Sequence, residues 1–327
     1  MTTIRIETPG TRAAANIRLY RYRIFLKAEA QLNLPEFKGA ALRGLFGHAL
    51  RQVACTIPGE DCRVCPFAGE CAYAVLFESM PPVGFPDAGK YRDFPRPYLI
   101  NPPLSRRQTY SPGQCLVFDL VLVGLAAEYL PHVIYAFDSL GRSGFGGRGR
   151  CSVARVENID EHGAAAVVFR DGNLLGPGQA LLLSGEEPVA GHEISLNLHF
   201  ITPARLESKG KLQDQAPEFG FLIRTFAQRV ALLASLYCAA GDPRDLIQPD
   251  FFDQAETVHL LDSDVEWREH ERFSTRQQAR LKQGGIVGTA VYQGPIQPFI
   301  PYLRLMLYLN IGKSTTFGLG RVSVTLG

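Results

Sequence analysis

The spacing of apolar residues in the first half of the chain switches between a period of two and a period near 3.6. Residues 17–27, 116–123 and 151–156 alternate or form short apolar runs, and they predict strands. Residues 37–53 and 128–140 repeat apolar side chains every three or four positions, and they predict helices. Strands and helices therefore follow one another along this half, as they do in an α+β domain.

The second half repeats this order. Residues 195–201 alternate as a strand, and Pro217 opens a long apolar helix that runs to about residue 239. Residues 301–310 predict a shorter helix, and residues 321–326 predict a closing strand. In the first half, residues 81–112 are rich in Pro, Arg and Tyr and predict a long irregular loop.

A short sequence recurs near the end of each half. The segment 145–153 reads FGGRGRCSV and the segment 317–324 reads FGLGRVSV, each after a predicted helix and before a predicted strand. Two such copies indicate a duplicated α+β unit, although two Gly-rich turns can also resemble each other by chance. We expect one domain over residues 1–188, with a cysteine-containing insertion at about residues 55–112, and a second domain over residues 189–327.

Length and composition agree with this organisation. The 327 residues suggest two domains, at roughly 150 residues for each. The 46% apolar content excludes a largely disordered chain. The longest apolar run, residues 115–130, carries Asp119 and Glu128 and predicts no membrane-spanning helix. Residues 1–16 contain no apolar signal segment, so we expect the protein in the cytoplasm.

Charge is distributed unevenly, although 34 basic and 32 acidic residues leave a net charge of only +2. Residues 207–271 contain thirteen acidic and six basic residues, whereas residues 272–327 contain seven basic residues and no Asp or Glu. This asymmetry favours a surface built for an anion, with nucleic acid as the leading candidate. The alternative is an accident of loops and buried strands.

Two glycine patterns resemble nucleotide-binding motifs but lack the required context. Gly144-x-Gly146-x-x-Gly149 matches the dinucleotide-binding fingerprint, but that motif follows a strand and opens a helix, and here the order is reversed. The residues from Gly312 to Ser314 resemble the end of a phosphate-binding P-loop without its first glycine or its helix. We therefore reject both nucleotide sites.

The two Gly-rich loops remain suited to RNA. Glycine lets backbone N–H groups approach an anion closely. The loops also supply cations and hydroxyl groups for phosphates, and aromatic rings for stacking on bases. The residues with these roles are Arg148, Arg150, Lys313, Arg321, Ser314, Thr315, Thr316, Phe145 and Phe317. The alternative is a pair of tight turns that only join helix to strand.

Four stretches of the second half resemble the RAMP superfamily of CRISPR-associated RNA-binding proteins. They are ITPARL at 201–206, Trp267 with RFSTRQ at 272–277, GGIVGTAVYQG at 284–294 and GKSTTFGLGR at 312–321. More narrowly, the chain resembles the CRISPR endoribonuclease that processes precursor crRNA, and its first half matches that family in outline. The resemblance implies two ferredoxin-like domains and metal-independent cleavage within the CRISPR repeat. We expect further RNA contacts at Arg272, Ser274, Arg276 and Gln277.

The implied reaction needs an acid–base residue. A metal-independent ribonuclease can use the 2′-OH of its substrate as nucleophile, with a base to remove its proton and an acid to protonate the leaving 5′-oxygen. The products are a 2′,3′-cyclic phosphate and a 5′-OH. Histidine suits this role because its pKa lies near neutrality.

In relatives a histidine on the first helix often serves, and His48 lies on that predicted helix. At ~100° per residue, His48 lies about 140° from the apolar stripe, beside Gly44 and Gly47, which leave room for an approaching backbone. Lys38 and Arg51 are candidate partners, as are Arg43 and Tyr22. The alternative is an ordinary surface histidine.

Seven cysteines in a chain without a visible secretion signal favour thiols or metal ligands over disulfides. Four of them, Cys55, Cys62, Cys65 and Cys71, cluster within 17 residues just after the predicted helix. Four thiolates suit a structural zinc site, which leaves no open position for hydrolysis, and an iron–sulfur cluster or free thiols are the alternatives. We expect Cys115, Cys151 and Cys238 in the core, and no cofactor for catalysis.

The leading functional hypothesis is an endoribonuclease that processes CRISPR precursor RNA. Its expected partners are CRISPR repeat RNA and crRNA, with the subunits of a CRISPR effector complex as further candidates and no membrane. A catalytically silent crRNA-binding subunit of such a complex is the main alternative. A general single-stranded RNA binder is the third.

Overall fold

The computed structural model describes residues 12–91, 93–183, 193–269, 271–274 and 279–327. Contacts divide the chain into two compact units. The N unit contains residues 18–183 together with 236–238, and the C unit contains the described residues of 12–17, 193–235 and 239–327. The predicted domain boundary at residue 188 lies outside the described residues and stays a prediction.

The N unit is built on a sheet in which every neighbouring pair is antiparallel. Its strand order is β3-β5-β1-β6-β7-β8. The elements are β1 (Leu19–Ala28), α2 (Gly39–Ala54), β3 (Tyr98–Asn101), β5 (Cys115–Val123), α3 (Leu130–Arg142), β6 (Cys151–Ile159), β7 (Ala165–Arg170) and β8 (Asn173–Leu174). The first six follow a βαββαβ order with β1 in the middle, which is the ferredoxin-like arrangement.

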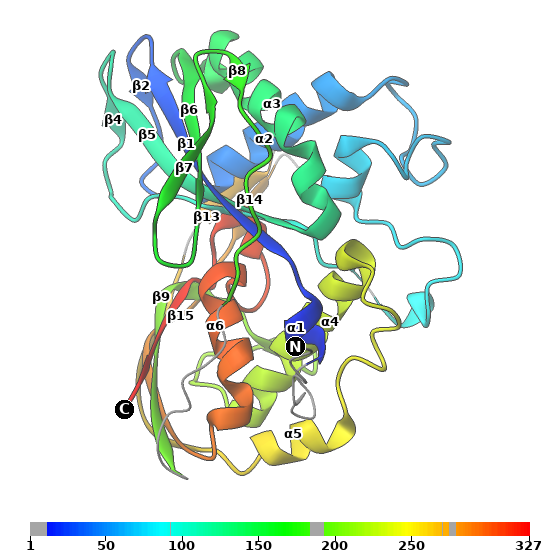
Figure 1. The fold of residues 1–327 in the computed structure, drawn as a ribbon. Helices are drawn as coiled ribbons and strands as arrows, with labels where there is room; N and C mark the ends of the chain where they lie inside the picture. Colours follow the sequence, from blue (N-terminus) through cyan, green and yellow to red (C-terminus); the bar gives the residue numbers. More distant parts are fainter. Residues whose placement is uncertain (1–11, 92, 184–192, 270, 275–278) are drawn as a thin grey trace. The chain divides into compact units, whose positions relative to one another are not determined.

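Helices α2 and α3 pack against each other and cover one face of this sheet (Figure 1). The alternation in β1 explains the layering, because Tyr22, Ile24 and Leu26 are fully buried. Leu42 and Phe46 of α2 belong to the same hydrophobic core. Such burial is worth roughly 1.5–3 kcal/mol for each large apolar side chain, so the apolar faces of strand and helix hold the layers together.

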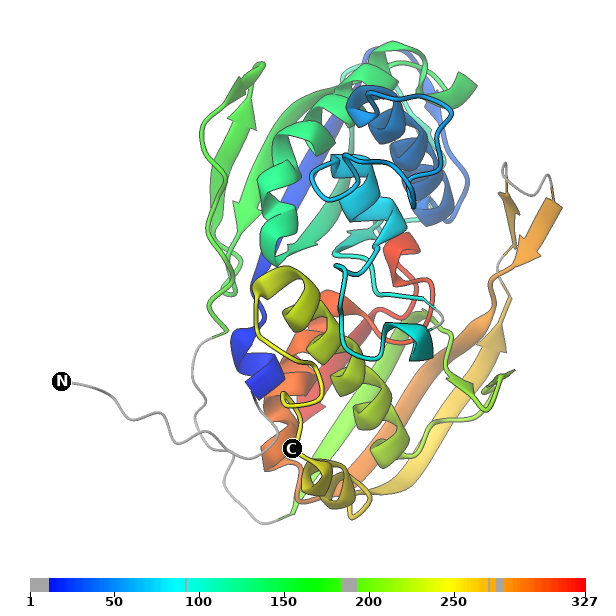
Figure 2. The same cartoon turned by 90° about the vertical axis from the view of Figure 1, so that its right-hand side faces the viewer.

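The C unit repeats the arrangement with a four-stranded antiparallel sheet in the order β12-β15-β9-β16. Its elements are β9 (Ile194–Ala204), α4 (Phe219–Cys238), α5 (Pro249–Ala255), β12 (His259–Arg268), β15 (Gly285–Gly294), α6 (Ile300–Leu309) and β16 (Val322–Leu326). Helices α4 and α6 lie on one face of the sheet (Figure 2). The predicted fold class, α+β with two ferredoxin-like domains, is confirmed.

Shorter elements complete the described chain. They are α1 (Arg12–Asn16), β2 (Leu32–Asn33), β4 (Thr109–Tyr110), β10 (Glu207–Ser208), β11 (Lys211–Leu212), β13 (Glu271–Ser274), β14 (Ala279–Lys282), the π-helical turn η1 (Ala74–Glu78), and the 3₁₀ turns η2 (Ala88–Lys90), η3 (Gly124–Tyr129), η4 (Phe145–Gly147), η5 (Gln297–Phe299) and η6 (Thr315–Phe317). Among the described residues, α4 is the one helix long and apolar enough to cross a membrane. Because 61% of its apolar window is buried inside the protein, it is a core helix.

The prediction of an irregular loop over residues 81–112 was wrong at two places. Strand β3 lies inside this range, pairs with β5 and has all four residues buried, and β4 pairs with β2. A four-residue strand that is buried on both faces shows no alternation, and the prolines around it mimic a loop. The missed strand is the second of the ferredoxin-like order.

Candidate functional site

The Gly-rich loop of the N unit forms backbone hydrogen bonds with the segment that follows β1. The carbonyl oxygens of Arg148 and Arg150 accept hydrogen bonds from the backbone N–H groups of Asn33 and Glu29, at 2.7 and 2.9 Å. Gly149 has φ +124°, and a Cβ there would collide with the carbonyl oxygen of Gln31. The guanidinium groups of Arg148 and Arg150 stay exposed, and within the described residues neither has an ion pair or hydrogen bond. Both remain candidates for RNA phosphates.

The Gly-rich loop of the C unit is held in a similar way by residues at the end of β9 and just after it. The Thr202 hydroxyl donates to the carbonyl of Gly318 at 2.8 Å and accepts from the backbone N–H of Arg321 at 2.9 Å. The backbone N–H of Lys313 donates to the carbonyl of Arg205 at 2.9 Å. A Cβ on Gly320, which has φ +71°, would collide with the carbonyl oxygen of Ile311. The stretch ITPARL therefore anchors the Gly-rich loop at residues 312–321. Both belong to the four stretches that carry the family resemblance.

Burial changes the roles of three predicted contacts in this loop. Thr315, Thr316 and Phe317 are each only 8% exposed, and Phe145 of the other loop is fully buried. Base stacking needs an open ring face, so the prediction that these rings stack on bases is wrong. The two threonine side chains are likewise inside the turn and not on its surface.

The remaining side chains of the C-unit loop are more accessible. The Lys313 ammonium is exposed but pairs with the Glu207 carboxylate at 2.6 Å. A phosphate would have to compete with Glu207 for this cation. Ser314 is half-buried with φ +62°, and Arg321 is half-buried. These three residues stay predictions as RNA contacts.

Two of the remaining RNA contacts predicted from the sequence lie on a paired strand. Arg272 and Ser274 lie on β13, which pairs with β14. Arg276 and Gln277 lie outside the described residues.

His48 lies on α2 with its side chain exposed. Leu45, three residues earlier, packs against the Gly-rich loop at Gly146. Residues three apart are neighbours on a helix surface, so His48 lies close to the point where the loop meets the helix. Gly44 faces open space, as expected for an approaching backbone. Gly47 does not, because it is buried against the Phe77 ring.

Two candidate partners of His48 are inside the protein. Lys38 is fully buried, and its ammonium donates to the carbonyls of Glu36 and Ser105 at 3.0 and 2.8 Å. Burial lowers the pKa of Lys38 from its ordinary value of 10.5. Tyr22 is fully buried and donates to the carbonyl of Pro177 at 2.5 Å. Neither side chain can reach an RNA backbone, and both serve the fold.

The other two candidates are engaged in contacts with aromatic rings. The Arg51 guanidinium lies 5.5 Å from the centroid of Tyr73, close to the thiols of Cys55 and Cys62. Because Arg51 lies beside the cysteines, a structural role explains its position more simply than a catalytic one. Arg43 is half-buried, with its guanidinium 4.9 Å from the Phe77 ring centroid. His48 is therefore the one candidate with an open acid–base side chain.

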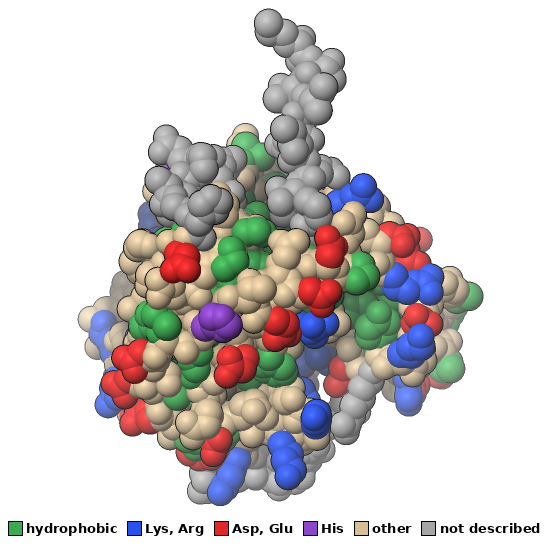
Figure 3. Space-filling view, turned by 90° about the horizontal axis from the view of Figure 1, so that it is seen from below, with side chains coloured by type: hydrophobic (Ala, Val, Ile, Leu, Met, Phe, Trp, Pro, Cys, Tyr) green, Lys and Arg blue, Asp and Glu red, His purple; other side chains and the backbone are tan. Residues whose placement is uncertain are grey.

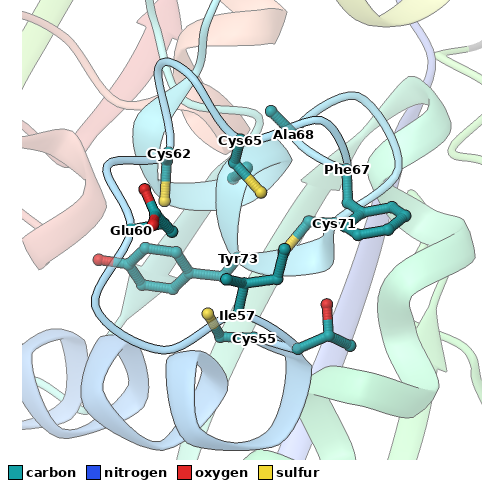
Figure 4. A pocket seen from close by; sticks show the side chains of 11 residues that line it. Cys55, Ile57, Glu60, Cys62, Cys65, Phe67, Ala68, Cys71 and Tyr73 are labelled. Carbon is teal, nitrogen blue, oxygen red and sulfur yellow. The ribbon is translucent and has the colours of Figure 1, made fainter.

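The four clustered cysteines line one small pocket just after α2 (Figure 4). All four are half-buried free thiols. In the described part of the chain, no group of three His, Cys, Asp or Glu side chains is arranged as a metal site. Of the cysteines expected in the core, Cys151 and Cys238 are buried and Cys115 is exposed. The prediction for Cys115 was wrong because it opens β5, where the strand leaves the core.

Sequence reasoning missed the role of Arg205. Its guanidinium donates to the carbonyl of Gly284 at 2.6 Å, and its backbone carbonyl holds Lys313. Glu269 accepts from the backbone N–H of Gly284 and from the Trp267 indole at 3.0 and 3.1 Å. Arg205 thus joins three of the stretches that carry the resemblance. Its position inside ITPARL was the available signal.

One face of the molecule carries acidic side chains intermixed with basic ones (Figure 3). Elsewhere in the described residues, exposed basic and acidic side chains also form ion pairs, such as Arg244 with Asp242 and Arg268 with Glu266. This face is therefore not uniformly basic, although the sequence from residue 272 onward is.

Comparison with known proteins decides the family. Residues 198–322 match the family model of CRISPR-associated endoribonuclease Cas6, and residues 17–180 match the model AF_1859_N, an N-terminal domain. Residues 198–322 therefore belong to the Cas6 endoribonuclease family. An uncharacterized protein of Archaeoglobus fulgidus is 24% identical over 278 residues, which are 80% of this chain and 82% of that protein.

Solved Cas6 structures share the fold. A Cas6 product complex aligns with TM-score 0.53 and 14% identity, over 94% of this chain and 99% of that one. Thermus thermophilus Cas6 aligns with TM-score 0.52 and 13% identity over the same shares. A partial Cas6-RT-Cas1–Cas2 complex aligns with TM-score 0.55 and 13% identity over 95% of this chain. This chain spans only 46% of the matched chain in that complex.

Proposed function

We propose that this Cas6-family chain cleaves CRISPR precursor RNA within its repeats, without a catalytic metal. The 2′-OH attacks the adjacent phosphate, and the products are a 2′,3′-cyclic phosphate and a 5′-OH. The observation that carries the proposal is the exposed His48 on α2, next to the Gly-rich loop. That loop also presents the guanidinium groups of Arg148 and Arg150, which are exposed and have no ion pair within the described part of the chain.

In this proposal His48 moves the proton. As a base it takes the proton of the 2′-OH, or as an acid it protonates the leaving 5′-oxygen, and such catalysis contributes typically 10²–10⁴-fold. Arg148 and Arg150 neutralise the charge that develops on the phosphate. The cations of the C-unit loop, Lys313 and Arg321, bind the RNA backbone elsewhere.

The proposed partners follow from the same chemistry. They are CRISPR repeat RNA and the crRNA product. The proposed location of the protein is the cytoplasm. One solved structure is a Cas6 product complex, and another is a partial Cas6-RT-Cas1–Cas2 complex. Those assemblies support, as a further proposal, a place for this chain beside other CRISPR proteins.

A silent crRNA-binding subunit is the second candidate function. It is favoured by the surroundings of His48, because Lys38 is buried and Arg51 faces the cysteines. Such a protein would bind repeat RNA through its Gly-rich loops, and another enzyme would cleave the RNA.

The test incubates purified full-length protein with cognate repeat RNA in EDTA and analyses the product ends. Cleavage that leaves a 2′,3′-cyclic phosphate is expected. Tight repeat binding without cleavage would favour the silent subunit. Equal affinity for unrelated RNA of the same length would favour a general single-stranded RNA binder.

A further inference from the structure

The segment between α2 and η1 has almost no core of its own. Residues 55–71 form a run of tight turns, and Val64 and Phe67 are 75% and 55% exposed. Hydrogen bonds within the segment are local, such as those from Ala68 N–H to the Cys65 carbonyl and from Cys71 N–H to the Phe67 carbonyl. A segment that buries so little apolar surface usually needs a cross-link or a metal to hold one conformation.

The turns bring all four thiols of this segment to one place. Cys62 and Cys65 flank a turn that is closed by a hydrogen bond from the Cys65 N–H to the Cys62 carbonyl at 3.4 Å. Cys55 caps the end of α2, and the Cys71 thiol donates to the carbonyl of Ala54 at 3.8 Å. In Figure 4 the Cys62 and Cys65 side chains approach from one side of the pocket and Cys55 from the opposite side.

The size of the pocket suits a single small guest. Its interior is about 20 Å³, and a water-sized guest needs roughly 10–15 Å³. The four sulfur atoms line this space, and a zinc ion held by four sulfur ligands at ~2.3 Å is small enough to lie within it. Within the described residues the thiols do not converge as metal ligands, so zinc binding requires their side chains to turn toward the pocket, and side chains turn between staggered χ1 positions.

The surroundings match the charge of a tetrathiolate site. Four thiolates around a divalent zinc carry two net negative charges. The Arg51 guanidinium lies beside the Cys55 and Cys62 thiols and over the ring of Tyr73. A cation at this distance offsets charge at the ligands, as partners around a metal site commonly do.

We propose that Cys55, Cys62, Cys65 and Cys71 bind one structural zinc ion that fixes the segment following α2. All four ligand positions are filled by protein, so this zinc has no open position for RNA or water. Its effect is to tie the end of the helix that carries His48 to the turn η1. The site is independent of the proposed cleavage chemistry.

The first test measures metal content in full-length protein after reconstitution with zinc sulfate and desalting. We expect about one zinc per chain, retained in Cys115→Ser, whose exposed thiol lies outside the cluster. The double variant Cys62→Ser/Cys65→Ser should lose this zinc and melt at a lower temperature. A zinc-free wild type, or full zinc retention in the double variant, overturns the proposal. Iron with acid-labile sulfide overturns it in favour of an iron–sulfur cluster.

A second measurement does not depend on how the variant folds. Wild-type protein is titrated with a mercurial reagent in the presence of a chromogenic zinc chelator. We expect zinc release in step with the modification of four thiols, and tetrahedral cobalt absorption when cobalt replaces zinc. Release without thiol modification, or an octahedral cobalt spectrum, contradicts a four-cysteine site.

Discussion

Two glycines in the interior of helix α2, Gly44 and Gly47, lie three residues apart in opposite surroundings. A Cβ on Gly44 would meet nothing within 4 Å, whereas a Cβ on Gly47 would overlap Cε1 of Phe77 and lie 3.0 Å from its Cζ. The Phe77 ring cannot easily move away. Its centroid lies 5.3 Å from the Tyr73 ring and 5.1 Å from the Tyr98 ring.

Changing either glycine to alanine should therefore have opposite effects on stability. Both changes gain roughly 0.5–1 kcal/mol from helix propensity. At Gly44 nothing opposes the gain, so Gly44→Ala should raise the free energy of unfolding by about that amount. At Gly47 the overpacked Phe77 ring costs about 1–3 kcal/mol. The net loss for Gly47→Ala should be about 0–2.5 kcal/mol.

Urea unfolding followed by far-ultraviolet circular dichroism measures both variants against wild type. A shift of the midpoint with an unchanged slope reports stability directly. In thermal unfolding, 1 kcal/mol corresponds to about 2–4 °C for a unit of this size. Equal stabilisation by both alanines would refute the close packing of Gly47 on Phe77.

The remaining predictions separate RNA contacts from structural side chains. Phe317→Ala should cost about 3–5 kcal/mol of stability, because the ring is buried; weaker RNA binding with unchanged stability would contradict this. Glu207→Gln should tighten RNA binding because it frees Lys313, and Lys313→Ala should reduce the slope of log affinity against log salt by about 0.7. Filter binding at several salt concentrations measures both quantities. An unchanged affinity in Glu207→Gln together with an unchanged slope in Lys313→Ala would contradict an RNA contact at Lys313. Burial lowers the pKa of Lys38, so between its folded and unfolded pKa values the unfolded chain binds more protons. The stability of wild type relative to Lys38→Met should therefore rise with pH toward 10.5; a flat difference in urea midpoints would count against it.

The sequence predicted the fold well wherever one face of an element met water. Strand β1 and helix α2 show clear periods because their outer faces are polar. Strand β3 was missed because all four of its residues are buried. Periodicity cannot identify a strand with two buried faces.

The candidate site was predicted less completely, because residue type does not fix exposure. Phe317 and Lys38 have the right chemistry for RNA, but both are buried in the turns that they stabilise. The repeat that singled out the Gly-rich loops reflects their shared architecture. In each unit the loop closes on the segment after the first strand, at Gly149 and at Gly312. Backbone packing alone therefore explains the glycines, and the proposed RNA binding depends on the exposed cations around them.

The most direct test of the proposed catalysis is the single-turnover rate of repeat-RNA cleavage by wild type, His48→Ala and His162→Ala. His162 is the matched control, because it is an exposed histidine in a turn of the same unit. We predict that His48→Ala lowers the rate at least ~10²-fold with unchanged RNA affinity, while His162→Ala cleaves like wild type. An unchanged rate in His48→Ala would contradict the account.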